Sequence, residues 1–224
     1  MFDQISPRYD FLNHVLSANV DKVWRKKAIR ILRPRNPRRI LDVATGTADF
    51  ALAAARLNPD KITGIDLSEG MLRIGVQKVR KAGLEDLITL QKADSEALPF
   101  DDGSFDSAIV GFGVRNFENL NKGLAEIYRV LDPGGIFIVL EFSRPRNKLF
   151  AKIYFWYFTK VLPFLGRIVS KDNSAYTYLP ESVQKFPDGK AFISILEATG
   201  FVNCSSKSLT LGIASIYKAE KPKI

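Results

Sequence analysis

The sequence predicts an α/β fold built on a seven-stranded, mostly parallel sheet with helices on both faces. Apolar runs suited to buried strands alternate with helix-length segments through most of the 224 residues. The first apolar run passes through a tight turn, LDVATGT at 41–47, directly into an alanine-rich helix, which is the start of a βαβ unit. The last two runs, 201–209 and 212–220, are close in sequence and therefore predict an antiparallel edge.

The individual elements follow from apolar runs and the breakers between them. Strands are expected at 38–45, 61–67, 87–94, 105–113, 136–143, 201–209 and 212–220. Helices are expected at 48–57, 69–81, 121–131 and 188–200. Ser68 is expected to cap the second helix and Gly83 to end it, while the turn DPGG at 132–135 stops the third.

Two segments fall outside this alternation of strands and helices. Residues 1–35 precede the first strand, and residues 144–187 separate the fifth strand from the last helix. Open α/β sheets bind ligands at the carboxyl ends of their strands, where such additions usually lie. We therefore expect one domain, 1–224, made of an N-terminal helical cover (1–35), a cofactor-binding core (36–143), a substrate lid (144–187) and a final helix and strand pair (188–224).

The charge balance points to an anionic partner. The net charge is +9, and the stretch from Asp21 to Arg39 contains nine Lys and Arg residues but a single acid. Such a cluster favours nucleic acid or an anionic membrane surface, and the alternative is a solvated helix face. With one cysteine, Cys204, and one histidine, His14, we expect no disulfide and no metal site. The N-terminus lacks the apolar run of a signal peptide, so the expected compartment is the cytoplasm.

Polar side chains close the first three predicted strands. Asp66 follows Gly46 by twenty residues, where a carboxylate can accept hydrogen bonds from both hydroxyls of a ribose. Asp94, with Ser95 behind it, ends the third strand and can accept from an adenine amino group. Asp42 lies inside the first strand, where a buried carboxylate needs a partner that a cationic ligand supplies.

These residues describe a site for adenosine and a positive charge, without phosphates. No Lys or Arg lies in the turn 44–48 to meet a diphosphate, and the turn has one glycine in place of three. S-adenosylmethionine fits this description, since it combines adenosine with a sulfonium and a zwitterionic amino acid. NAD is the second choice, and the missing glycines and the closing strand pair count against it.

Longer motifs resemble a known family. The segments LDVATGTADFAL, GIDLSEGML, ADSEALPF and YRVLDPGGIFIVLEFS, in this order, resemble Rossmann-like class I S-adenosylmethionine-dependent methyltransferases. The segments FDQISPRYDFLNHVLSANVDKVWR and YTYLPESVQKFPD are typical of the ubiquinone/menaquinone biosynthesis C-methyltransferases within that class. The sequence departs from this pattern at Leu12, Asp21, Gly111 and Asp132, where members often have Met, His, Ser and Lys.

The resemblance implies C-methylation of a polyprenyl quinol, first demethylmenaquinol to menaquinol, and alternatively a benzoquinol of ubiquinone synthesis. The residues expected to bind the cofactor are Asp42, Thr45, Gly46, Asp66, Asp94, Ser95 and Arg25, the last through the methionine carboxylate. Arg115 is expected to stabilise the developing oxyanion or hold a water, although it can instead pair with Glu118. Asn116 would orient the reacting group, and Tyr9 would cover the cofactor or bind the quinol.

An apolar, aromatic segment at 149–169 bears on membrane contact. Three basic residues and Pro163 interrupt it, so it does not predict a transmembrane helix. It favours a lid helix, a path for the polyprenyl tail, or a helix at the inner face of an anionic membrane. Nucleic-acid methylation is the rival function, but GFGVRN stands where an Asp/Asn-Pro-Pro-aromatic motif is expected, so we expect no nucleic-acid partner. The sequence leaves a homodimer open.

Overall fold

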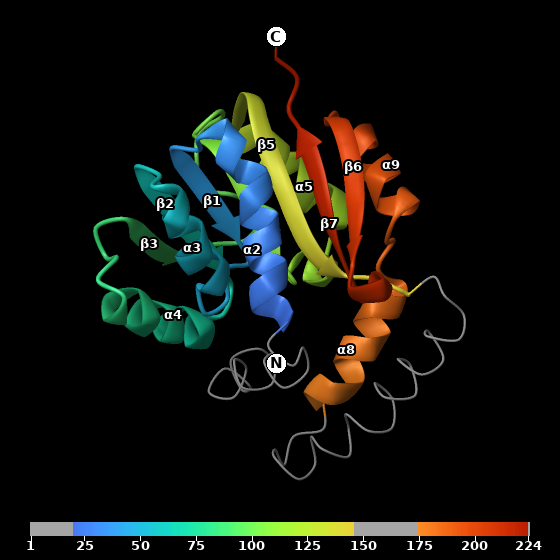
Figure 1. The fold of residues 1–224 in the computed structure, drawn as a ribbon, viewed down its shortest axis with the longest axis horizontal. Helices are drawn as coiled ribbons and strands as arrows, with labels where there is room; N and C mark the ends of the chain where they lie inside the picture. Colours follow the sequence, from blue (N-terminus) through green and yellow to red (C-terminus); the bar gives the residue numbers. More distant parts are fainter. Residues whose placement is uncertain (1–19, 146–173, 224) are drawn as a thin grey trace.

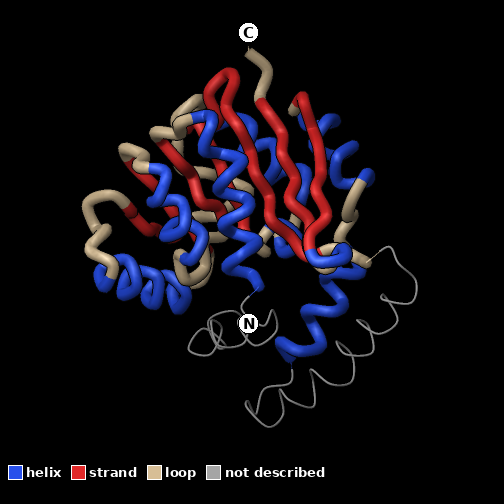
Figure 2. Tube along the Cα trace, viewed as in Figure 1, coloured by secondary structure: helices blue, strands red, loops and turns tan. Residues whose placement is uncertain are grey.

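The computed structural model describes residues 20–145 and 174–223. Within them, a seven-stranded sheet lies between two layers of helices (Figures 1 and 2). The strand order is β3-β2-β1-β4-β5-β7-β6, and β7 alone runs antiparallel to its neighbours in this sheet. The strands are β1 (Arg39–Val43), β2 (Lys61–Asp66), β3 (Ile88–Lys92), β4 (Phe105–Gly111), β5 (Leu131–Phe142), β6 (Val202–Leu209) and β7 (Ala214–Glu220). The predicted mostly parallel sheet with an antiparallel closing strand is confirmed.

The helices are α2 (Val20–Leu32), α3 (Asp49–Ala54), α4 (Glu69–Lys81), α5 (Leu120–Val130), α8 (Ser174–Lys185) and α9 (Lys190–Thr199). Four of the helices, α3, α4, α5 and α9, are close to their predicted positions, whereas α2 and α8 lie in the two additional segments, for which no individual helix bounds are predicted. Short 3-10 helices occur at η1 (Arg33–Arg35), η2 (Ala55–Leu57), η3 (Val114–Asn116) and η5 (Thr210–Gly212). Ser68 caps α4 as predicted, because its Oγ accepts the backbone N–H of Met71 at 3.2 Å.

The DPGG segment, predicted to be a turn between a helix and a strand, is part of strand β5. Strand β5 already begins at Leu131 and runs through these four residues to Phe142. Its pairing with β4 shifts register between Phe105 and Ser107, and Gly134 has φ +80°. A local irregularity in the pairing with β4 thus accommodates Pro133 and the two glycines inside the strand.

Both faces of the sheet are buried. Neighbouring residues of β1 point to opposite sides, so Ile40 packs with Trp24 and Phe50 under α2 and α3, whereas Leu41 packs toward α5 and α9. Ile40 and Leu41 are both fully buried. Each such side chain contributes roughly 1.5–3 kcal/mol when removed from water. This double burial explains why the strands appear in the sequence as continuous apolar runs.

The described parts of the two additional segments have different positions. Residues 20–35 form α2 and η1, and α2 lies along one face of the sheet in front of β1 and β5 (Figure 1). Trp24 anchors it, with ring centroids 6.1 Å from Phe112 and 6.3 Å from Phe142. Helix α8 instead contacts η3, beyond the end of β4. The rest of the expected cover, 1–19 and 146–173, lies outside the described residues. In the described part, no helix has the length and apolar character needed to cross a membrane.

Candidate cofactor and substrate site

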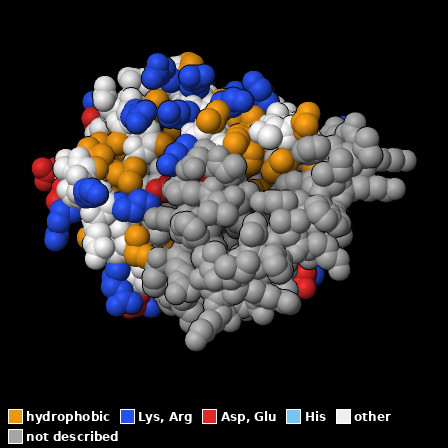
Figure 3. All heavy atoms as spheres, turned by 60° about the horizontal axis from the view of Figure 1, so that its bottom comes forward, with side chains coloured by type: hydrophobic (Ala, Val, Ile, Leu, Met, Phe, Trp, Pro, Cys, Tyr) orange, Lys and Arg blue, Asp and Glu red, His pale blue; other side chains and the backbone are white. Residues whose placement is uncertain are grey.

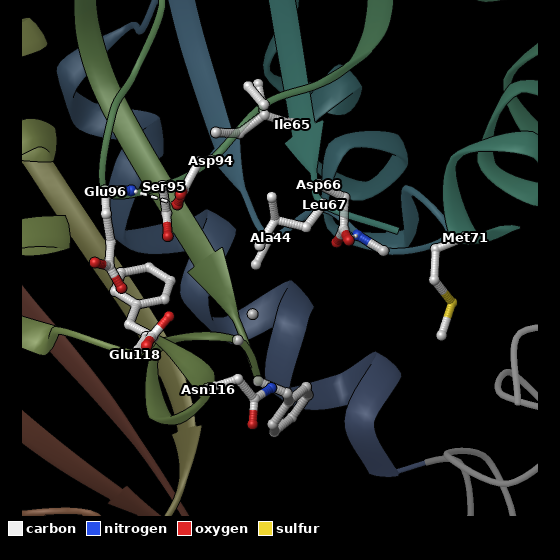
Figure 4. A pocket seen from close by; sticks show the side chains of 16 residues that line it. Ala44, Ile65, Asp66, Leu67, Met71, Asp94, Ser95, Glu96, Asn116 and Glu118 are labelled. Atoms are coloured by element: carbon white, nitrogen blue, oxygen red, sulfur yellow. Dashed lines mark hydrogen bonds between the residues drawn. The ribbon is translucent and has the colours of Figure 1, made fainter. Parts of the chain in front are cut away.

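The cavity that contains the predicted cofactor residues Asp66 and Asp94, called the main cavity below, lies where the strand order reverses. Strand β1 has β2 on one side and β4 on the other, so the connections after these strands lead in opposite directions and leave a crevice. A cavity of about 250 Å³ occupies this position. The ends of four strands contribute to its lining, which includes Gly46, Asp66, Asp94, Ser95, Gly111 and Asn116 (Figure 4).

The turn after β1 has an unusual backbone. Ala44, Gly46 and Ala48 all adopt the left-handed conformation, with φ of +53°, +56° and +65°. The two alanines each carry a steric cost of roughly 1–2 kcal/mol, which Gly46 avoids. A Cβ on Gly46 would meet no atom within 4 Å, so its conformation, not crowding, favours glycine. The space beside this turn is therefore available to a ligand.

Asp66 holds this turn in place. Its Oδ2 accepts the backbone N–H of Gly46 at 2.8 Å, and its Oδ1 accepts the N–H of Ser68 at 2.9 Å. The same carboxylate lines the cavity. Asp94 stands at another side of the cavity, where its Oδ1 accepts the N–H of Glu96 at 2.9 Å (Figure 4). The structure thus brings Asp66 and Asp94 to one cavity, as predicted from their strand ends.

A second, small cavity of about 30 Å³ adjoins the first at Gly46. Asp42 lines it and is fully buried. Its Oδ2 accepts the hydroxyl of Thr45 at 2.7 Å, whereas its Oδ1 has no hydrogen-bond partner in the structure described. Burial is the main cause that raises the pKa of Asp42 to about 7. A cavity of this size suits a group as small as a water molecule or an ammonium. A cationic group there would compensate the buried carboxylate.

Arg25 reaches this small cavity from α2. Its side chain forms an ion pair with Asp21, and its Nη2 lies 3.7 Å from Oδ2 of Asp49. Asp49 also pairs with Lys78 of α4, whose Nζ donates to Oγ1 of Thr47 at 3.1 Å. Alternating charges therefore connect α2, α3 and α4 around the glycine turn. Arg25 thus lines the small cavity together with Thr45 and Gly46 of the glycine turn.

The sequence interpretation missed two members of this network. The available signal for Asp49 is an acid in the first turn of the helix that follows the glycine turn. Lys78 carries no comparable signal, because a lysine in the last turn of an amphipathic helix is usually solvated.

Arg115 has a different setting from the one expected. It does not pair with Glu118; instead, its Nη1 lies 2.6 Å from Oε1 of Glu141 and donates to the carbonyl of Phe112. The Arg115 side chain is 6% exposed and that of Glu141 is fully buried. A buried carboxylate requires a compensating charge, which explains why the guanidinium turns away from the main cavity. Arg115 lines a third cavity of about 290 Å³, between η3 and α8.

Asn116 lies between the main and the third cavity. It lines the main cavity (Figure 4). Its Oδ1 accepts the hydroxyl of Tyr178 at 2.8 Å. Tyr178 lines the third cavity from α8. No individual role is predicted for Tyr178 from the sequence; its only signal is its place in the subfamily motif YTYLPESVQKFPD. The predicted site residue Tyr9, and also His14, lie outside the described residues.

The reversal of strand order, the antiparallel β7 and a single-glycine turn with carboxylates at neighbouring strand ends define a class I methyltransferase. A putative S-adenosyl-L-methionine-dependent methyltransferase from Methanococcus maripaludis has the same fold, with a TM-score of 0.69, 18% identity, and coverage of 100% of this chain and 95% of that chain. The chain belongs to the ubiE/COQ5 methyltransferase family, whose model matches residues 1–221.

Two relatives show how far the similarity extends. A Bacteroides fragilis protein named demethylmenaquinone methyltransferase is 46% identical over 99% of this chain and 91% of its own length. A Geotalea daltonii protein named ubiquinone/menaquinone biosynthesis C-methyltransferase UbiE is 49% identical over 99% of this chain and 94% of its own length. The predicted family, the methyltransferase activity and S-adenosylmethionine as the methyl donor are confirmed.

The buried Arg115–Glu141 pair makes a prediction about stability. Glu141→Gln removes the charge that compensates Arg115, so it should lower the free energy of unfolding by about 3–5 kcal/mol. Asp132→Asn is a matched control, because Asp132 pairs with Arg39 on the surface, and it should cost less than about 1 kcal/mol. Urea denaturation measures both. Equal losses in the two variants would contradict the structural role of Glu141.

Asp42 makes a prediction about pH. Its folded-state pKa of about 7 lies above the unfolded value of about 3.9. Between these two values the folded protein holds a proton on Asp42 that the unfolded chain has lost. The contribution of Asp42 to the free energy of unfolding is therefore fully present below pH 4 and is lost as the pH rises through 7. Asp42→Asn removes this titration. Without ligand, its unfolding free energy relative to the wild type should therefore increase between pH 4 and 8. Parallel pH profiles for the two proteins would contradict the burial of an uncompensated carboxylate.

Proposed function

We propose that the protein transfers a methyl group from S-adenosylmethionine to a ring carbon of a polyprenyl naphthoquinol, converting demethylmenaquinol to menaquinol. The observation that carries this proposal is a nucleoside-sized cavity joined to a small cavity with an uncompensated carboxylate. The Bacteroides fragilis relative's name supports the naphthoquinol ring. The name of the Geotalea daltonii relative also covers ubiquinone synthesis, so a polyprenyl benzoquinol is the second candidate.

The two joined cavities suggest how the cofactor is held. In the main cavity, Asp66 would accept hydrogen bonds from the ribose hydroxyls, and Asp94 with Ser95 would meet the adenine. In the small cavity, Asp42 would compensate the cationic end of the methionine.

Arg25 would bind the methionine carboxylate beside Thr45 and Gly46, which line the same small cavity. Because Arg25 also faces Asp21 and Asp49, its orientation is fixed before the ligand arrives. The residues of α2, α3 and the glycine turn therefore form one preorganised binding surface for the amino-acid end.

Methyl transfer to a quinol ring needs little acid–base chemistry from the protein. When bound, S-adenosylmethionine supplies the electrophilic methyl group. A phenol titrates near pH 10, so the protein must favour loss of the quinol proton to enrich the adjacent ring carbon in electrons. Asn116 lines the main cavity, and its Oδ1 already accepts from Tyr178, so its amide N–H groups would donate to the quinol oxygen or to a water.

Arg115 and Tyr9 receive supporting roles in this proposal. Arg115 contacts the carbonyl of Phe112 and lies 3.3 Å, through its Nε, from Oγ of Ser182 in α8. It would thus position the loop that carries Asn116 against α8. Tyr9 would cover the cofactor or hydrogen-bond the quinol, as the family motif suggests.

The proposed substrate implies contact with a membrane. A polyprenyl quinol partitions into the bilayer, so we place the protein in the cytoplasm with peripheral, salt-sensitive contact at the inner face of the membrane. The net charge of +9 supports an anionic surface as partner. The described residues 174–187 would form part of the wall that the quinol meets, since Tyr178 and Ser182 line the cavity beside Asn116.

Replacement of Asp66 tests the cofactor site. Asp66→Ala removes the expected acceptor for ribose hydroxyls and frees the turn at Gly46, so it should weaken S-adenosylmethionine binding by about 2–3 kcal/mol. Asp66→Asn keeps one acceptor and should fall between the alanine variant and the wild type. Titration calorimetry measures these affinities, and thermal unfolding checks that each variant is folded. Wild-type affinity in a folded Asp66→Ala protein would remove Asp66 from the site.

The choice of ring is tested with substrates. Purified protein with S-adenosylmethionine should methylate a reduced demethylnaphthoquinone with a short prenyl chain faster than the matching benzoquinol. Asn116→Ala should lower kcat more than it changes the affinity for S-adenosylmethionine, because Asn116 would act on the quinol. Faster methylation of the benzoquinol would favour the second candidate, and turnover of neither ring would overturn the proposal.

A further inference from the structure

A groove of about 440 Å³ runs between α2 and the α3–η2 segment. Basic side chains surround it: Lys22, Lys26, Arg30, Arg33 and Arg56. Part of its lining is apolar, from Ile29, Leu52 and Ala53. We call this feature the basic groove. It adjoins the cofactor site at Arg25 and Asp49, which line both the basic groove and the small cavity of Asp42.

The helical repeat arranges the cations in a row. Lys22, Lys26 and Arg30 are spaced four residues apart, so they lie on one side of α2 over roughly 12 Å. Arg33 continues the row in η1, and Arg56 faces it from η2. Like charges at this spacing repel one another and destabilise a helix. An anion in the basic groove would remove that repulsion.

These cations lack the ion pairs that basic residues later in the same cluster form. Among the described residues, none of the five forms an ion pair, and all five are exposed. The carboxylate in the lining, Asp49, is already paired with Arg25 and Lys78. By contrast, the next basic residues along the chain form ion pairs, in which Arg35 meets Glu220, Arg38 meets Asp60, and Arg39 meets Asp132. The basic cluster seen in the sequence therefore leaves its uncompensated charge mainly in this groove.

We propose that the basic groove binds the phosphate headgroup of an anionic phospholipid, with the glycerol and first acyl carbons against Ile29, Leu52 and Ala53. The inference rests on the proposed function, since a polyprenyl quinol must be collected from a bilayer. An apolar lining favours an amphiphile over a free phosphate or a nucleic acid backbone. Val23, 47% exposed on α2, adds apolar surface to the same helix. Figure 3 shows Lys and Arg side chains gathered with hydrophobic ones on this side of the molecule.

Binding to vesicles tests the proposal. Cosedimentation would use full-length protein at low salt with vesicles rich in phosphatidylglycerol and with vesicles of phosphatidylcholine alone. The wild type should bind the anionic vesicles only, and added salt should release it. The triple variant Lys22→Gln/Lys26→Gln/Arg30→Gln should bind them roughly 100-fold more weakly, since each cation near an anionic surface contributes about fivefold.

A control of equal charge separates the groove from the net charge. Arg73→Gln/Lys122→Gln/Lys207→Gln removes one arginine and two lysines from exposed positions on α4, α5 and β6, and it should change vesicle binding less than about tenfold. Equal losses in the two triple variants would show that net charge alone acts and would overturn the proposal. The proposal would also be overturned if the wild type bound both vesicle types equally. It would likewise be overturned if inorganic phosphate or RNA displaced the protein from anionic vesicles at lower concentration than phosphatidylglycerol micelles do.

Activity measurements on two substrates separate a failure of the basic groove from a failure of the proposed function. The groove variant should methylate a short-chain quinol in the absence of vesicles at the wild-type rate, because its three residues do not line the cofactor cavities. It should lose activity on a long-chain quinol embedded in anionic vesicles. If no protein methylates either quinol, the substrate assignment fails while vesicle binding still decides the basic groove.

Discussion

The hydrogen bond from the backbone of Gly46 to Asp66 ties the ends of β1 and β2 together, and the site depends on it. Parallel pairing places these two strand ends side by side, with Val43 opposite Ile65. Asp66 then accepts from the glycine turn on one side and from Ser68, the cap of α4, on the other. One carboxylate thus fixes the positions of a turn, a helix start and a cavity wall.

Two buried carboxylates, Glu141 and Asp42, differ in how their negative charge is compensated. Glu141 is compensated inside the protein by Arg115 and by the N–H of Phe142. Asp42 accepts the hydroxyl of Thr45 through Oδ2, whereas its Oδ1 has no hydrogen-bond partner in the structure described. The compensated carboxylate lies in β5 and holds Arg115 of the β4–α5 connection in place. The uncompensated one faces a small cavity, which is where a cationic ligand gains most from the protein's electrostatics.

Much of the fold follows from local sequence signals, whereas parts of the site depend on tertiary packing. The strands are long apolar runs because both faces of the sheet are covered, and Asp66 and Asp94 meet because parallel strands end at one edge. The partner of Arg115 could not be read from the sequence, since Glu141 lies 26 residues away in a buried strand and a nearer acid was available. Strand β5 likewise continues through Pro133, because a register shift with β4 overrides the local turn signal.

The left-handed alanines of the glycine turn also affect how selectively a ligand is held. Glycine at 44 or 48 would relieve steric strain, but it would let the turn sample many conformations. With Ala44 and Ala48 held by the surrounding structure, the loss of backbone freedom occurs during folding and not during ligand association. The turn therefore offers a rigid template, so a ligand that mismatches its shape gains nothing from local adjustment, and discrimination between related nucleosides becomes sharper.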